Sequence, residues 1–113
     1  MTRISSHVLD TSAGRPAAGL AARLERSGPG AGGPAPLASA TTDADGRVRD
    51  WLPDGVPAGR YRLVFETGPW FRAAGRDTLY AEVVIDFEVQ VGASHYHLPL
   101  LLSPFGYSTY RGS

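Results

Sequence analysis

The chain has 113 residues, of which 42% are hydrophobic, and this size suits one domain, residues 1–113, with a single core. Its 11 basic residues balance 11 acidic residues, so charge alone would not attract nucleic acid or an anionic membrane. The sequence contains no cysteine, which excludes disulfides, thiolate catalysis and metal sites with cysteine ligands.

The first predicted element is a strand at residues 4–9, where apolar and polar residues alternate. The two faces of this strand carry Ile4, Ser6 and Val8 on one side and Ser5, His7 and Leu9 on the other. A break is expected at residues 10–16. A second strand at residues 20–25 alternates in the same way, and a loop rich in glycine and proline follows at residues 27–36.

A third strand is expected at residues 37–42, followed by a turn with the sequence Asp43-Ala44-Asp45-Gly46. This turn places Arg47 at the start of a short strand that runs to Trp51. Residues 61–66 alternate again, and the predicted core face carries Tyr61, Leu63 and Phe65.

The remaining elements are one short helix and three strands. Residues 69–76 predict two turns of helix with Pro69 at the first position. Strands are expected at residues 81–91, 95–103 and 107–111. Many short strands with one brief helix indicate an antiparallel β-sandwich of about eight strands.

The histidine pair His95 and His97 is the first chemical feature. Residues two apart on a strand project from the same face, so the pair can bind a metal ion or act as acid and base. An exposed pair near a strand start is the commoner arrangement, and a metal site would need a third ligand. The face of His97 continues through Pro99 and Leu101, which would limit its solvation and lower its pKa. A neutral imidazole is a good general base.

Arg47 and Tyr110 each admit two interpretations. Arg47 is either a solvated charge at a turn or a planar clamp for an anionic substrate. Tyr110 either packs against its neighbours or presents its hydroxyl to a ligand. The sequence has no nucleophile elbow, phosphate-binding loop or carboxylate cluster with the spacing of a metal site, so most enzyme templates are absent.

Five segments form a combined pattern that covers the whole chain. They are Ser6-His7-Val8-Leu9-Asp10, Gly14-Arg15-Pro16-Ala17, Thr42-Asp43-Ala44-Asp45-Gly46-Arg47, His95-Tyr96-His97-Leu98-Pro99-Leu100-Leu101-Leu102-Ser103-Pro104 and Tyr110-Arg111-Gly112-Ser113. In these segments the chain resembles the transthyretin-like 5-hydroxyisourate hydrolases of purine degradation. The resemblance implies an all-β, transthyretin-like (prealbumin-like) sandwich that forms a homotetramer, a dimer of dimers, with active sites where the dimers meet.

The resemblance also implies the reaction and its residues. The reaction is hydrolysis of 5-hydroxyisourate to 2-oxo-4-hydroxy-4-carboxy-5-ureidoimidazoline, without cofactor or metal ion, by histidine-assisted addition of water at a lactam carbonyl. The implied catalytic residues are His7, Arg47, His97 and Tyr110. Of these, His7, Arg47 and Tyr110 are also expected to bind substrate, Ser113 is a further candidate, and His95 is expected to have a supporting role.

Three alternatives stay open at this point. A carrier of small molecules on the same fold would bind a ligand without turnover, although hormone-carrying transthyretins have a lysine, a glutamate and two threonines at the matching positions. A metal-dependent hydrolase would use His7, His95 and His97 as ligands, and a chelator would then abolish its activity. A structural module would leave histidines on apolar faces without a reason.

The sequence also predicts a location. The first residues lack the apolar run of a signal peptide, and no apolar stretch approaches the roughly 20 residues of a membrane span. We therefore expect a cytoplasmic protein with no nucleic-acid or membrane partner.

Overall fold

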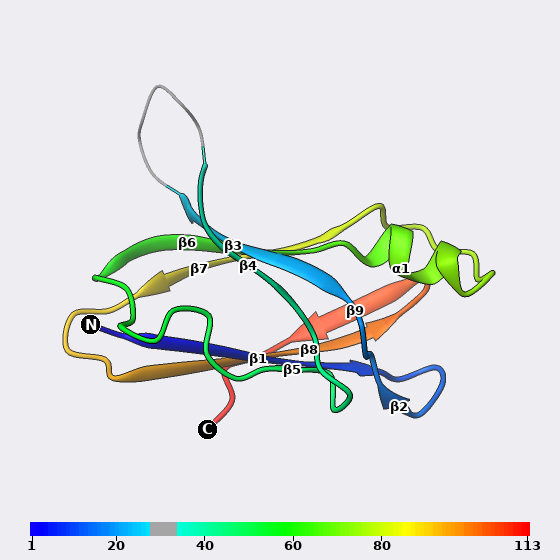
Figure 1. The fold of residues 1–113 in the computed structure, drawn as a ribbon, viewed down its shortest axis with the longest axis horizontal. Coiled ribbons are helices and arrows are strands. Elements are labelled where there is room, and N and C mark those ends of the chain that lie inside the picture. The colour runs from blue at the N-terminus through cyan, green and yellow to red at the C-terminus, as the bar shows by residue number, and fades with distance from the viewer. Residues whose placement is uncertain (28–33) are drawn as a thin grey trace.

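The computed structural model describes residues 1–27 and 34–113, and it contains two β-sheets that lie face to face with one short helix (Figure 1). The first sheet has the order β2 (Arg15–Pro16), β1 (Arg3–Asp10), β8 (His95–Ser103) and β9 (Gly106–Thr109), and β5 (Arg47–Val48) also pairs with β1. The second sheet has the order β4 (Ala35–Thr41), β3 (Ala21–Ser27), β6 (Gly59–Phe65) and β7 (Val83–Val89). The expected all-β sandwich with one helix is confirmed, with nine strands in the described residues.

The hydrophobic core lies between the two sheets, and it includes the predicted core face of β6. Its members include the alternating residues Ile4, Val8, Leu20, Ala22, Leu24, Tyr61, Leu63 and Phe65, all of them buried. On β1 the same alternation turns His7 to the outer face of the first sheet, where it is only partly buried. The core therefore fixes which side chains the first sheet presents outward.

One strand pairing departs from the antiparallel pattern. β1 and β8 run parallel along the whole of β1, whereas the other strand pairings among the described residues are antiparallel. Parallel neighbours need a long crossover, and here the second sheet lies between them in the chain. The parallel register places Ser5 beside His97 and His7 beside Pro99.

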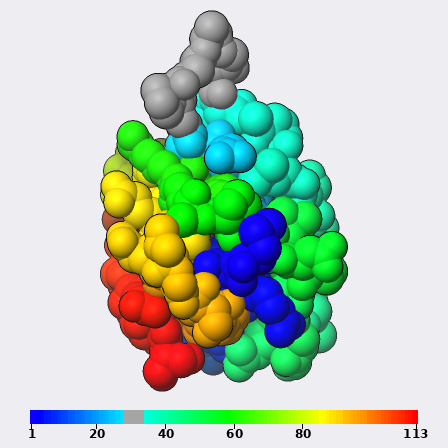
Figure 2. Space-filling view, turned by 90° about the vertical axis from the view of Figure 1, so that its left-hand side faces the viewer, coloured from blue at the N-terminus to red at the C-terminus, as the bar shows by residue number. Residues whose placement is uncertain are grey.

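The start of β1 is held in place by two loops. Thr2 exchanges backbone hydrogen bonds with Val56, and its hydroxyl donates to the carbonyl of Ala93 at 2.6 Å. The backbone N–H of Arg3 donates to the carbonyl of Ser94 at 3.0 Å. Figure 2 shows the N-terminal residues in blue, packed between the green and yellow segments that contain these loops. The strand that carries Ser5 and His7 is thus anchored at its beginning.

Two short elements differ from the prediction. The expected break at residues 10–16 contains β2, because Arg15 and Pro16 pair with the end of β1. The strand expected to reach Trp51 ends at Val48, although the backbone N–H of Trp51 still donates to the carbonyl of Ile4 at 3.0 Å. The expected loop at residues 27–36 is bounded by β3 and β4, and its central part, residues 28–33, lies outside the described residues.

The helix α1 covers Thr67–Ala73, so it begins earlier than the sequence predicted. Pro69 occupies its third position and not its first, which the helix tolerates because the first-turn N–H groups have no intrahelical partner. Within residues 1–27 and 34–113, no helix has the length and apolar character that a membrane crossing requires.

Candidate active site

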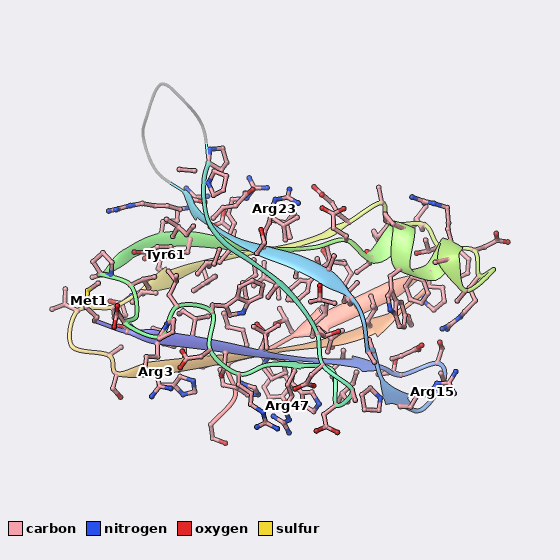
Figure 3. The ribbon with its side chains drawn as sticks, viewed as in Figure 1. Met1, Arg3, Arg15, Arg23, Arg47 and Tyr61 are labelled. Carbon is pink, nitrogen blue, oxygen red and sulfur yellow. The ribbon has the colours of Figure 1, made fainter. Side chains whose placement is uncertain are left out.

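A hollow of about 510 Å³ lies on the outer face of the first sheet, where polar and cationic side chains gather. Its lining residues are Arg3, Ser5, Ser6, Arg47, Arg49, His95, His97 and Ser113. A second hollow adjoins it and is lined by His7, Leu9, Pro16, Asp45, Arg47 and Arg49. Arg47 borders both hollows and points away from the second sheet, on the side where the chain ends (Figure 3).

The position of Arg47 is fixed by the tight turn that precedes it. One carboxylate oxygen of Asp43 accepts hydrogen bonds from the backbone N–H groups of Asp45 and Arg47, both at 2.9 Å. These bonds lower the pKa of Asp43. Gly46 has a φ of 77°, and a Cβ there would lie 2.3 Å from the carbonyl oxygen of Val8. Only glycine fits so close to β1, and this contact holds Arg47 against that strand.

His7 lies directly beside Arg47, because the two residues are partners in the β1–β5 pairing. Its Nε2 atom is 2.8 Å from the backbone carbonyl oxygen of Asp45. A carbonyl can only accept a hydrogen bond, so Nε2 of His7 carries a proton and donates it to Asp45. The turn therefore orients the imidazole of His7 and fixes the backbone of Arg47.

His97 is partly buried and lines the first hollow. Burial is the main reason why the pKa of His97 lies below its ordinary value of 6.5, and electrostatic interaction with Arg47, His7 and His95 lowers it further. The predicted direction of this shift is confirmed. At neutral pH the imidazole is uncharged and can accept a proton.

The C-terminal segment lies over His97. The backbone N–H of Gly112 donates to the carbonyl of His97 at 2.7 Å. A Cβ on Gly112 would lie 2.5 Å from Cδ2 of the imidazole, so a larger residue would displace the ring or the segment. The guanidinium of Arg111 lies over the ring of Tyr96, 4.3 Å from its centre. These contacts bring Ser113 to the hollow.

The structure does not bring every predicted residue together. His97, Arg47 and Ser113 line one hollow and His7 lines the adjoining one, but Tyr110 lines neither and is 56% exposed. The sequence also predicted apolar surroundings for the histidines, and the structure shows them beside His7 but not in the hollow that His97 lines. Leu9 and Pro16 contribute to the hollow beside His7, whereas the lining around His97 is mostly polar or cationic.

Two residues of this site were missed by sequence reasoning. Arg49 lines both hollows, and its position two residues after Arg47 was a signal that both face the same way. The hydroxyl of Ser5 lies within hydrogen-bond distance of both His95 and His97. Alternation placed Ser5 on the outer face, but only the parallel register shows which residues it contacts.

The geometry gives no support to a metal site. In the described parts of the chain, no group of three or more His, Asp or Glu side chains is placed to hold a metal ion. The arrangement that the structure does show is a neutral imidazole, a guanidinium and a second imidazole on one sheet face. Such a set can activate water and stabilise a developing negative charge.

Comparisons with known proteins show what the whole chain is similar to. The family model described as HIUase/Transthyretin family matches residues 4–112. A 5-hydroxyisourate hydrolase from Caulobacter vibrioides is 44% identical over 118 residues, covering 100% of both chains. The Klebsiella pneumoniae 5-hydroxyisourate hydrolase structure has a TM-score of 0.89 and 44% identity, with 100% of both chains covered. Sea bream transthyretin in complex with thyroxine has a TM-score of 0.88 and 31% identity, covering 96% of this chain and 93% of that chain.

Proposed function

Because the chain belongs to the HIUase/Transthyretin family, we propose that it hydrolyses 5-hydroxyisourate to 2-oxo-4-hydroxy-4-carboxy-5-ureidoimidazoline at the hollow around His97. The observation that carries this proposal is the neutral imidazole of His97 beside Arg47. Among the described residues, Arg47 forms no ion pair, so its guanidinium is available to a ligand. Relatives named 5-hydroxyisourate hydrolase support the substrate.

His97 acts as the general base in this proposal. It takes a proton from water while the water oxygen attacks the lactam carbonyl carbon of the flat six-membered ring. The carbonyl π electrons move to oxygen, and collapse of the resulting tetrahedral intermediate breaks the ring C–N bond. The leaving nitrogen then receives a proton from an imidazole. His7 is coupled to this exchange, because its ring lies beside Arg47 and lowers the pKa of His97.

Arg47 holds the anionic ring and the charge that develops on the carbonyl oxygen. Its planar guanidinium can donate two parallel hydrogen bonds, which a lysine ammonium cannot reproduce. The turn at Gly46 fixes the backbone of Arg47 before substrate arrives, and preorganised donors are worth most in a site that excludes water.

Three further assignments rest on the family resemblance. Tyr110 positions substrate or water, and Ser113 contacts substrate where it lines the hollow. The protein forms a homotetramer in which dimers cover this sheet face and exclude bulk water. A cytoplasmic location remains a prediction from the sequence.

The test is the decay of freshly generated 5-hydroxyisourate, produced from urate in the cuvette and followed by ultraviolet absorbance. We expect the protein to accelerate this decay, with or without a chelator. A folded protein that gives no acceleration would contradict the proposal. The transthyretin-type carrier, which the sea bream structure makes the second candidate, predicts tight ligand binding without turnover.

A further inference from the structure

A buried serine hydroxyl joins the two histidines of β8. The Oγ atom of Ser5 lies 2.9 Å from Nε2 of His95 and 2.8 Å from Nδ1 of His97. Ser5 is 7% exposed, whereas His95 is exposed and His97 partly buried. The parallel pairing of β1 with β8 creates this contact by placing Ser5 beside His97. The three polar atoms therefore form a chain from the partly buried His97 to the exposed His95.

The number of protons in this chain limits its states. A serine hydroxyl has one proton, so it donates to one imidazole and accepts from the other. In one state Nδ1–H of His97 donates to Ser5, and Ser5 donates to Nε2 of His95. Nε2 of His97 then has no proton and can act as a base. In the opposite state Nε2 of His97 carries the proton and can act as an acid.

We propose that Ser5 and His95 form a proton relay that switches His97 between these states, an inference that rests on the hydrolysis proposed above. When Nε2 of His97 takes a proton from water, its Nδ1 proton passes to Ser5 and the Ser5 proton passes to Nε2 of His95. Three bonds to hydrogen break: one in water, one at Nδ1 of His97 and one at Oγ of Ser5. Three form, at Nε2 of His97, at Oγ of Ser5 and at Nε2 of His95. His95 becomes the imidazolium. The reverse transfer supplies the proton that the leaving nitrogen needs.

The surroundings of His97 favour this route. The charged and titratable residues around it are Arg47 from β5, His7 from β1 and His95 from β8, with Arg3, Arg49 and Ser113 lining the same hollow. The positive charge of the neighbouring arginines disfavours a state in which His97 keeps two ring protons and becomes an imidazolium. His95 can release the proton to solvent because it is exposed, while Ser5 itself is closed to bulk water. In this role Ser5 positions His97 by fixing its tautomer, and His95 carries the proton away.

The first variant is Ser5→Ala, measured in the whole protein. We expect kcat to fall about 10- to 100-fold, which is the effect of removing a partner that orients a metal-binding histidine, while KM changes little. Ser5→Thr keeps the hydroxyl and should restore most of the rate. Ser6→Ala is the matched control, because it removes a buried hydroxyl of the same strand that accepts from the indole of Trp51 at 2.9 Å. It should lower Tm without changing the tautomer of His97.

The second variant is His95→Ala, which should fold normally because this side chain is exposed. We expect its kcat to fall and to recover when free imidazole is added to the buffer. A purely structural role of His95 would give no such recovery. Imidazole should leave the rate of the unaltered protein unchanged.

NMR of the ring ¹⁵N nuclei separates this inference from the proposed function. The signals report the tautomer of His97 whether or not the protein hydrolyses 5-hydroxyisourate. An inactive unaltered protein would overturn the function and, with it, the relay. If the unaltered protein is active, either of two results in folded Ser5→Ala would overturn the relay. One is a His97 tautomer the same as in the unaltered protein, and the other is an undiminished kcat. If Ser5→Ala fails to fold, a full kcat in His95→Ala, or a loss that imidazole does not restore, overturns it.

Discussion

Arg47 and Arg49, beside the candidate site on the first sheet, differ from the arginines on the outer face of the second sheet in how closely they pair with carboxylates. On the second sheet, Arg23 donates to Glu25 at 2.7 Å and Arg60 donates to Asp86 at 2.6 Å, so each guanidinium has a close carboxylate. On the first sheet, Arg3 pairs with Asp50, but Arg49 has carboxylates only at 3.9 and 4.0 Å, and among the described residues Arg47 has none. Arg23 and Arg47 lie on opposite sides of the sandwich (Figure 3).

The difference separates a structural from a chemical use of the same residue type. A guanidinium that is paired with a carboxylate contributes modestly to stability and is not available to a ligand. An unpaired guanidinium repels neighbouring cations, and here it lowers the pKa of His97. The first sheet therefore keeps an imidazole neutral and a donor group free, which is what hydrolysis of an anionic ring requires.

The largest expected effect comes from His97→Ala. Loss of the general base should lower kcat at least about 100-fold, because positioned acid or base groups typically contribute 10²- to 10⁴-fold. The decay of 5-hydroxyisourate gives the rate, and thermal unfolding shows whether the variant is folded. A folded variant that keeps most of its activity would contradict the assignment of His97 as the base.

The next largest effect is expected from Arg47→Lys. The charge remains but the planar pair of donors is lost, so kcat/KM should fall at least about tenfold. Arg60→Lys is the matched control on the second sheet, where an exposed ion pair is altered and activity should not change. If Arg47→Lys and Arg60→Lys were equally active, the proposed chemical role of Arg47, as opposed to the structural role of Arg60, would be contradicted.

Glu25→Gln should have the opposite profile, with a change in stability and none in activity. Glu25 is 8% exposed and contacts Arg23 and Arg62, so neutralising it should lower the free energy of unfolding by about 1 kcal/mol, since both arginines are partly screened by solvent. Urea unfolding gives this value, and Glu88→Gln at an exposed position is the control. A loss of activity in the folded Glu25→Gln protein would contradict the division of roles.

The smallest effect concerns the titration of His97. Because Arg47 lowers the pKa of His97, Arg47→Gln should raise that pKa toward 6.5, as measured by NMR titration. In the unaltered protein the unfolded chain binds the proton of this histidine more readily, so stability should fall as pH drops below 6.5 through the lower folded pKa. His97→Gln should remove this part of the pH dependence. A pKa of His97 that does not respond to Arg47→Gln would show that the two groups are not coupled.

Local patterns in the sequence predicted much of this fold. Alternation separated the two faces of β1 and β3 and identified the core face of β6, and the turn residues after Thr42 correctly placed Arg47 at the exit of a turn. Strand boundaries otherwise agree within about two residues, which is the ordinary scatter of such assignments. The resemblance to a known family added the residues that its motifs contain.

Contacts between distant segments could not be predicted in this way. The parallel pairing that brings Ser5 to His97 depends on how two strands far apart in the chain align, and alternation carries no information on that register. Asp45 contacts His7 through its backbone carbonyl, which no side-chain pattern reveals. For Tyr110 the sequence suggested a place in the site, while the structure shows an exposed ring beyond both hollows.

The most direct test of the central claim is a crystal structure of the protein with urate, a stable planar relative of the substrate. We predict that urate lies on the outer face of the first sheet, with Arg47 donating to the ring and His97 within hydrogen-bond distance of the position of the attacking water. Urate bound on the outer face of the second sheet, or bound without contact to Arg47 and His97, would contradict the account.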